Sequence, residues 1–385
     1  MADGDHKETG SGPGLFAITT PGLESVTAQE INNLGVREAH VIFGGVGFFG
    51  SRQILYQTNL HLRTASRILL RLGSFRATKF AELRRKTGHL PWEKYLTPDQ
   101  PVVMRVSCHH SRLIHSGAVE ERVLGAVADR LGGAVQAVPP RNVEASSARL
   151  IFVRIANDQC IISVDSSGAL LHQRGYRLST AKAPLRETLA AGMILASGWD
   201  GRSPLMDPFC GSGTIAIEAA LIARAIPPGS SRRFAFMDWP NFDKALWESL
   251  VAESRPPAEA AVPPIVASDR DQGAVEAALD NAGRAGVKDC IAFSRRPVSD
   301  IDPPGGCGWI VTNPPYGVRL SQSRDLRDLH ASFGHVLRDK CPGWKLTMLC
   351  GNASLQRATG LDFGQATSVT NGGLKVRLVS GRVPE

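Results

Sequence analysis

Two short segments of this 385-residue chain carry side chains that could do chemistry. The first is a glycine-rich run, Asp207-Pro208-Phe209-Cys210-Gly211-Ser212-Gly213-Thr214, which follows the apolar tripeptide Pro204-Leu205-Met206 and precedes a helical pattern. Strand, glycine-rich turn and helix in this order are typical of the entrance to a nucleotide-type cofactor site, because glycine permits a close backbone approach. The second is Asn313-Pro314-Pro315-Tyr316, which follows the apolar run Trp309-Ile310-Val311.

These segments resemble motifs I and IV of the class I methyltransferases that use S-adenosylmethionine and act on exocyclic amines. More narrowly, the chain resembles the THUMP-domain RNA guanine-N2 methyltransferases over nearly its whole length. The resemblance implies an α/β fold. Its catalytic domain is a Rossmann-like, doubly wound, mostly parallel sheet with an antiparallel edge hairpin, and an α+β ferredoxin-like and THUMP RNA-binding module precedes it. Further stretches that carry the resemblance are Ser111 to Val119, Leu171 to Arg177, Ala183 to Glu187 and Asn313 to Leu320.

The implied cofactor is S-adenosylmethionine. In this reading the glycine-rich turn presents backbone N–H groups to the cofactor's carboxylate, and Asp207 lies near its ammonium group. Asp269, at the end of the next strand, is placed to accept hydrogen bonds from the ribose hydroxyls. Asp271 is the alternate for that role, and Asp269 could instead cap the following helix. The residues predicted to bind the cofactor are Pro184, Asp207, Pro208, Phe209, Cys210, Gly211, Ser212, Gly213, Thr214, Asp269, Arg270, Asp300 and Asn313.

Two points of cofactor recognition stay open. The resembling enzymes have an acid beside the adenine amine where this chain has Pro297, so either Asp300 substitutes for it or packing holds the adenine. A dinucleotide site is the main alternative for Gly211 and Gly213. The Asn-Pro-Pro-Tyr segment decides against a dinucleotide, since a dehydrogenase has no use for it.

The Asn-Pro-Pro-Tyr segment has a direct chemical interpretation. An exocyclic base amine is a poor nucleophile, because its lone pair is delocalised into the ring. The Asn313 side-chain oxygen and the Pro314 carbonyl can accept its two N–H bonds, which turns nitrogen electron density toward the methyl group. The prolines fix the backbone, and Tyr316 can stack on the base. We predict Asn313, Pro314, Pro315 and Tyr316 as the catalytic residues; a plain Pro-Pro turn is the structural alternative.

Basic residues crowd between His61 and Lys86, where Glu82 is the single acid. Any one of these side chains could belong to an ordinary solvated face, but the set favours contact with RNA phosphates. The segment from Gly168 to Ala181 is also basic and aromatic, which suits RNA contact or a simple linker. The residues predicted to bind RNA are Arg63, Arg67, Arg76, Lys79, Arg84, Arg85, Lys86, Arg112, His115, Arg174, Arg177 and Arg319.

The sequence pattern, together with what the resemblance implies, divides the chain into five parts. We expect a disordered N-terminus (1–13), a ferredoxin-like α+β part (14–60), a THUMP RNA-binding domain (61–167), a linker (168–182) and a class I methyltransferase domain (183–385). Strand and helix alternation breaks between Ile226 and Pro264, where aromatic residues are expected to form a mini-core over the sheet edge rather than to stack on bases. Lys345 to Cys350 and Leu374 to Val379 are expected to close an antiparallel hairpin at the sheet edge.

Composition is consistent with a polyanionic partner, because the formal net charge is +8. The scattered cysteines suggest free thiols in a reducing compartment, and no signal peptide or membrane span is recognisable, so we expect a cytoplasmic protein. Cys108, His109, His110 and His115 lack the second ligand pair of a zinc site, so no metal is predicted. A monomer is expected, because one chain already joins an RNA-holding module to a catalytic one.

The leading hypothesis is methylation of the guanine N2 amine in ribosomal or transfer RNA. One alternative is N6-adenine methylation of RNA or DNA, since the same four residues serve that amine. The other is an RNA-binding protein whose methyltransferase domain is inactive.

Overall fold

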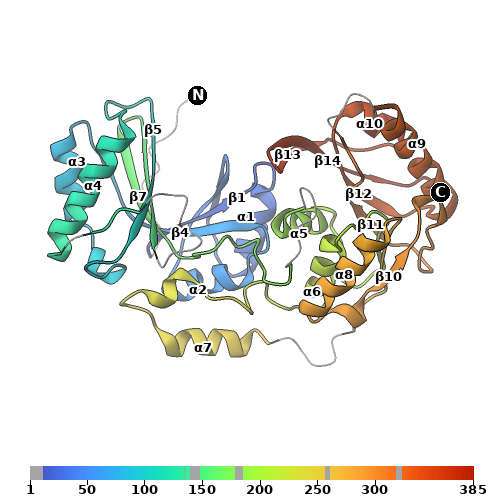
Figure 1. The fold of residues 1–385 in the computed structure, drawn as a ribbon, viewed down its shortest axis with the longest axis horizontal. Coiled ribbons are helices and arrows are strands. Elements are labelled where there is room, and N and C mark those ends of the chain that lie inside the picture. The colour runs from blue at the N-terminus through green and yellow to red at the C-terminus, as the bar shows by residue number, and fades with distance from the viewer. Residues whose placement is uncertain (1–11, 134, 139–147, 178–184, 256–260, 318–322) are drawn as a thin grey trace.

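The structure, a computed structural model, describes residues 12–133, 135–138, 148–177, 185–255, 261–317 and 323–385. Within these residues two seven-stranded sheets form two modules side by side (Figure 1). This confirms the predicted α/β fold with an α+β module in front of it. The predictions made for residues 1–11, for Pro184 and for Arg319 lie outside the described residues.

The N-terminal sheet has the strand order β2-β3-β1-β4-β7-β6-β5. Its neighbours pair antiparallel except for the parallel pair β5 and β6. β4 pairs with β1 through its first half and with β7 through its second half. The sheet is therefore continuous across the predicted boundary at residue 60. Its strands are β1 (Gly14–Thr19), β2 (Ala39–Ile42), β3 (Gly45–Phe49), β4 (Ala65–Arg76), β5 (Val102–His109), β6 (Arg149–Ala156) and β7 (Gln159–Asp165).

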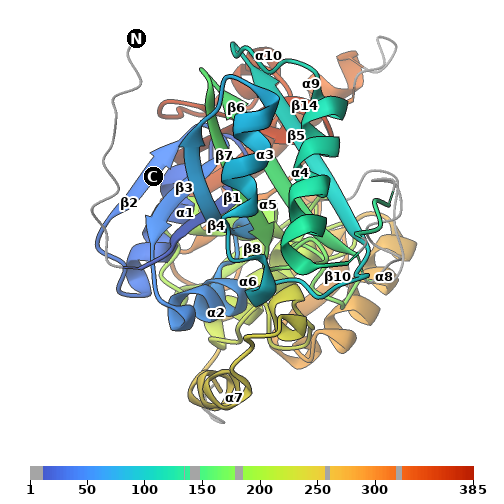
Figure 2. The same cartoon turned by 90° about the vertical axis from the view of Figure 1, so that its left-hand side faces the viewer.

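Four helices pack on this sheet: α1 (Glu24–Asn33), α2 (Arg52–His61), α3 (Phe80–Gly88) and α4 (Ser116–Leu131). Local sequence sets several of their ends. The Ser51 side chain caps α2 by accepting the Ile54 N–H, and α4 ends at Gly132 in the left-handed conformation that glycine favours. Figure 2 shows α3 and α4 side by side in front of β5, β6 and β7.

The C-terminal sheet has the order β10-β9-β8-β11-β12-β14-β13, parallel from β10 to β12 and antiparallel at β14 and β13. The predicted antiparallel pairing at the sheet edge is confirmed, because β14 pairs with β12. The sequence pattern did not reveal β13, the outermost strand, which pairs with the other side of β14. Its strands are β8 (Leu205–Asp207), β9 (Ile265–Asp269), β10 (Ala292–Arg295), β11 (Trp309–Thr312), β12 (Lys345–Cys350), β13 (Thr367–Asn371) and β14 (Leu374–Arg382), and its helices are α5 (Glu187–Ala196), α6 (Thr214–Ala223), α8 (Gln272–Arg284), α9 (Ser323–Lys340) and α10 (Ala353–Ala358).

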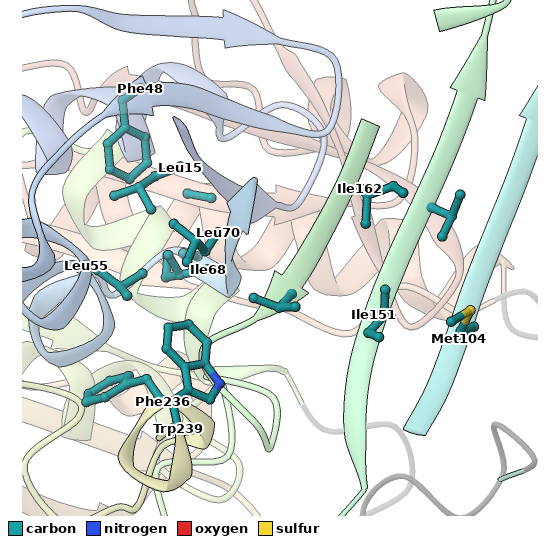
Figure 3. Packing of buried hydrophobic residues seen from close by; sticks show 14 of the residues in the cluster. Leu15, Phe48, Leu55, Ile68, Leu70, Met104, Ile151, Ile162, Phe236 and Trp239 are labelled. Atoms are coloured by element: carbon teal, nitrogen blue, oxygen red, sulfur yellow. The ribbon is translucent and has the colours of Figure 1, made fainter. Parts of the chain in front are cut away.

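The aromatic insertion between α6 and β9 carries α7 (Lys244–Glu253) and packs differently from our expectation. Phe234, Phe236 and Trp239 do form a cluster, but they join the core of the N-terminal module rather than the edge of the catalytic sheet. Phe236 stacks on Tyr56 of α2 with ring centroids 4.4 Å apart, and Figure 3 labels it, with Trp239, among the buried residues of this core. The insertion therefore completes the core of the other module, a long-range partner that local sequence does not specify.

No helix within the described residues is long and apolar enough to cross a membrane.

Candidate active site

The glycine-rich turn and the Asn-Pro-Pro-Tyr segment meet at the carboxyl ends of β8 and β11. These neighbouring strands mark the point where the strand order reverses, which is where doubly wound sheets bind ligands. A cleft of about 1090 Å³ opens here. The predicted site residues that line it are Asp207, Pro208, Phe209, Cys210, Gly211, Ser212, Thr214, Asp269, Arg270, Asn313, Pro314, Pro315 and Tyr316.

Glycine is required at two positions of the turn. Gly211 has φ +50° and Gly213 has φ +82°, a region that other residues rarely adopt. A Cβ on Gly213 would also lie 2.9 Å from the Ala278 methyl group of α8. The turn is fixed to the next strand, because the Cys210 N–H donates to the Ser268 carbonyl over 2.9 Å. Together these contacts hold the start of α6 against the cleft, where its N–H groups can face an anion.

Asp207 supplies a buried carboxyl group at the end of β8. Its Oδ1 accepts hydrogen bonds from the Thr312 hydroxyl, at 2.6 Å, and from the Phe209 N–H, at 3.3 Å. Burial raises the pKa of Asp207 from 3.8 to about 7, the two hydrogen bonds oppose that rise, and the charge of Asp269 adds to it. No cation within the described residues pairs with this carboxyl group, so an ammonium group in the cleft would favour its ionised form.

Asp269 is tied to the glycine-rich turn. Its Oδ2 accepts the Gly211 N–H at 3.0 Å, and its Oδ1 accepts the Asp271 N–H at 3.0 Å. The cap of α8 is Asp271, whose carboxylate accepts the Ala274 N–H. The helix-cap alternative therefore belongs to Asp271, and the Asp269 carboxylate lies in the cleft wall.

The two candidates for the adenine contact lie in different places. Pro297 and Val298 line the cleft, whereas Asp300 is exposed and lies outside its lining. This placement favours packing over a hydrogen bond from Asp300.

The side-chain oxygen of Asn313 is a buried hydrogen-bond acceptor. Among the described residues its Oδ1 has no hydrogen-bond partner, although the atom is shielded from solvent. A buried acceptor left unpaired costs about 1–3 kcal/mol, so it marks a place where a donor is expected. Pro314 next to it is buried. The Tyr316 hydroxyl is held by the Asn371 amide over 2.6 Å.

Two walls of the cleft were missed by sequence reasoning, because they come from elements distant along the chain. One wall is α9, and its residues recur at helical spacing. The other is the turn between β13 and β14, whose glycine pair was the available signal. These lining residues are Asp325, Leu326, Asp328, Leu329 and Ser332 on α9, and Asn371, Gly372 and Leu374 at the hairpin.

The RNA-binding prediction needs correction for four arginines, because their charged groups are used inside the protein. Arg67 is 6% exposed and donates to Asp165 over 2.5 Å. Arg177 lies 3.3 Å from Glu187 and donates to the Thr214 hydroxyl, which connects the linker to α5 and α6. A side chain committed in this way is not available to a phosphate.

The other two arginines surround one buried acid. Arg174 is 5% exposed, its Nε lies 3.6 Å from Glu218, and its guanidinium also donates to the Arg63 carbonyl. Arg63 lies 4.0 Å from Glu218 and donates to the Ile226 carbonyl, just past the end of α6. Arg63, Arg174 and Glu218 thus join the N-terminal module, the linker and the helix that begins at the glycine-rich turn.

The remaining basic residues divide into two groups. Arg84 and Lys86 are half-buried and pair with Asp129 and Glu82, each at 2.7 Å. The other predicted contacts within the described chain are exposed; they are Arg76, Lys79, Arg85, Arg112 and His115.

Comparison with known proteins agrees with this geometry. Residues 174–380 match the family model described as "RMKL-like, methyltransferase domain", and residues 14–69 match the "RlmL ferredoxin-like domain". The "Putative RNA methyltransferase slr0064" of Synechocystis is 34% identical, over 94% of this chain and 95% of its own length. The "Ribosomal RNA large subunit methyltransferase K/L" of Methylococcus capsulatus is 35% identical over 94% of this chain, which spans only 50% of that relative.

Solved structures give the same result. The crystal structure of "SMU.472, a putative methyltransferase complexed with SAH" has a TM-score of 0.84 and 29% identity, over 96% of this chain and 97% of its own. These matches confirm the predicted methyltransferase fold and S-adenosylmethionine as the predicted cofactor. The chain belongs to the RMKL-like methyltransferase family.

Proposed function

We propose that this protein transfers the methyl group of S-adenosylmethionine to the exocyclic N2 amine of a guanine in ribosomal or transfer RNA. The observation that carries the proposal is the buried Oδ1 of Asn313 at the edge of the cleft, which has no hydrogen-bond partner in the part of the chain that the structure describes. An acceptor in this position is suited to a donor from a bound base, and an exocyclic amine supplies one.

The cofactor would lie along the glycine-rich turn. Asp207 fits its ammonium group, the N-terminus of α6 fits its carboxylate, and Asp269 fits its ribose hydroxyls. S-adenosylmethionine supplies an activated methyl group on a sulfonium, so the protein has only to position and polarise the acceptor.

The acceptor amine would lie against the catalytic segment. The Asn313 oxygen and the Pro314 carbonyl would accept its two N–H bonds, which concentrates the nitrogen lone pair on the side facing the methyl group. The Tyr316 ring would stack on the base, which has to leave its neighbours to enter the cleft. Transfer of the methyl group would break the C–S bond, leave a neutral thioether and make the amine nitrogen positive. Both acceptor oxygens would stabilise that charge until one N–H proton is released to solvent.

RNA as the substrate class rests on the relatives' names and on charge. The N-terminal module offers exposed cations on β4, on α3 and near its start, and in the segment before α4; these include Arg76, Lys79, Arg85 and Arg112. Contacts of this kind give affinity without sequence selectivity, as phosphate neutralisation does. We propose that the protein works as a monomer in the cytoplasm, where both classes of RNA are found.

Guanine N2 and adenine N6 remain chemically close, because both are exocyclic amines beside a ring nitrogen. The test is to incubate the protein and labelled S-adenosylmethionine with total RNA from a strain lacking the gene, and to identify the methylated nucleoside by mass spectrometry. N2-methylguanosine is expected. N6-methyladenosine would retain the site and overturn the choice of base.

The mechanism is tested with Asn313→Ala. Loss of the acceptor oxygen should lower kcat by about 10²–10³-fold, as loss of a single charge-stabilising group does. Cofactor binding measured by calorimetry should stay within about threefold of the wild-type value, since Asn313 faces the amine. Full turnover in this variant would refute the proposed role.

A further inference from the structure

The wall of the cleft around Tyr316 comes from the far end of the domain. Asn371 and Leu374 lie at the turn of the hairpin β13–β14, where they are paired in register, and both line the cleft beside Tyr316. Asn371 ends β13, the edge strand of the sheet. Its amide nitrogen donates to the Tyr316 hydroxyl over 2.6 Å.

We propose that Asn371 is a positioning residue for the methyl transfer, which fixes the ring of Tyr316 as a preformed stacking surface for the target base. The proposal rests on the function proposed above, in which Tyr316 contacts the base. It assigns Asn371 no contact with the reacting atoms.

The Tyr316 side chain is held at both of its ends. At the near end, its Cβ packs over Gly351, where an added Cβ would lie only 2.8 Å away. At the far end, the hydroxyl accepts the Asn371 hydrogen bond. A tyrosine side chain has two rotatable torsions, so contacts at its base and at its tip leave the ring face little freedom.

The hairpin is itself held in place by the N-terminal module. Gly22, just before α1, lies so close to β13 that an added Cβ would be 2.3 Å from the Ser368 carbonyl oxygen. Leu23 and Val369 are each 1% exposed and belong to one buried cluster. β13 therefore pairs with β14 and also contacts the N-terminal module near Ser368 and Val369, which restrains the strand that ends at Asn371.

Alternative reasons for the hydrogen bond are weaker. Asn371 is only half-buried, so its amide could be satisfied by water, and the fold does not require a tyrosine partner for it. The Tyr316 hydroxyl has a greater need of a protein partner, because its side chain packs against two buried clusters. A requirement that the Tyr316 ring keep one orientation explains this hydrogen bond.

The test compares Asn371→Leu, Tyr316→Phe and the double variant. Leucine keeps the approximate volume and removes the donor, whereas phenylalanine keeps the stacking surface and removes the acceptor. Each single change should lower kcat about tenfold, because the ring loses one of its two restraints. The double variant should be no slower than the slower single variant, since both remove the same contact. The Kd for S-adenosylmethionine should be unchanged.

Two controls separate positioning from damage to the fold. Asn371→Asp should recover most of the rate, because a carboxylate can accept the hydrogen bond that the tyrosine hydroxyl then donates. Thr370→Ala, at the exposed neighbouring position of β13, should leave kcat and Tm at wild-type values.

The outcomes are distinct. If the wild-type protein methylates guanine and Asn371→Leu keeps full kcat, the positioning role is wrong while the proposed function stands. A leucine variant that loses kcat, Tm and cofactor affinity together, with no recovery in Asn371→Asp, also refutes positioning. If the wild-type protein transfers no methyl group to RNA, the proposed function itself fails.

Discussion

Asp207→Asn is expected to stabilise the free protein at pH 8, but not at pH 5, while it weakens cofactor binding. The wild-type carboxyl group is buried, and its pKa rises from 3.8 to about 7 because burial disfavours the charged form. The folded state therefore holds this proton more tightly than the unfolded chain. As pH rises from about 4 to about 7, the unfolded chain releases the proton first, so the wild-type protein loses stability over that window.

The size of the effect on the free energy of unfolding follows from the shift in the Asp207 pKa. A difference of about three pKa units corresponds to about 4 kcal/mol lost by pH 8, as an order of magnitude. Asparagine has no such dependence, although its amide NH₂ group brings a pH-independent cost of about 1–3 kcal/mol if it stays unpaired. Between pH 5 and pH 8, the unfolding free energy of the wild-type protein therefore falls by about 3 kcal/mol relative to that of the variant.

The assay is thermal unfolding of both proteins at pH 5 and pH 8 without cofactor. The Tm of the variant relative to wild type should rise by roughly 5–10 °C between the two pH values. Calorimetry at pH 8 should show a cofactor Kd weakened at least about tenfold, because an ammonium–carboxylate pair is lost. A Tm difference that is the same at both pH values would refute the assigned pKa shift.

The glycine-rich turn and the basic surface give two more predictions. Gly213→Ala should cost about 3 kcal/mol of unfolding free energy, because the added methyl group meets Ala278 in a left-handed conformation, whereas Gly211→Ala, with open space around it, should cost about 1 kcal/mol. Denaturant unfolding distinguishes them, and equal costs would contradict the packing argument. Lys79→Glu with Arg85→Glu should weaken RNA binding about tenfold at low salt and flatten its salt dependence. Filter binding over a salt series measures both, with cofactor affinity as the control; an unchanged salt slope would exclude these two side chains from the RNA contact.

The local features of the site were predictable from the sequence. The glycine-rich turn and the Asn313 segment each lie directly after an apolar strand, so their position in a parallel sheet follows from sequence order alone. The alternation of strand and helix also predicts the doubly wound fold. These features need no knowledge of distant partners.

Long-range pairing explains what could not be predicted. Arg63 and Arg67 look like phosphate ligands in a basic stretch, because their acids, Glu218 and Asp165, lie about a hundred residues or more further along the chain. The same reason hides Asn371, which reaches the cleft only through a hairpin that closes after β12. Composition reports the number of charges, and the fold decides which of them face solvent.

The aromatic insertion has a consequence for synthesis of the protein on the ribosome. The core of the N-terminal module includes Phe234, Phe236 and Trp239, which are made only after β8 and α6 of the catalytic domain. A nascent chain ending before the insertion would expose the face of Tyr56 that the Phe236 ring covers. At about 5–20 residues per second, the N-terminal module waits several seconds for its last core residues. The N-terminal module is therefore completed only after the first elements of the catalytic domain have been synthesised, and the catalytic domain is completed later still, when β13 and β14 emerge.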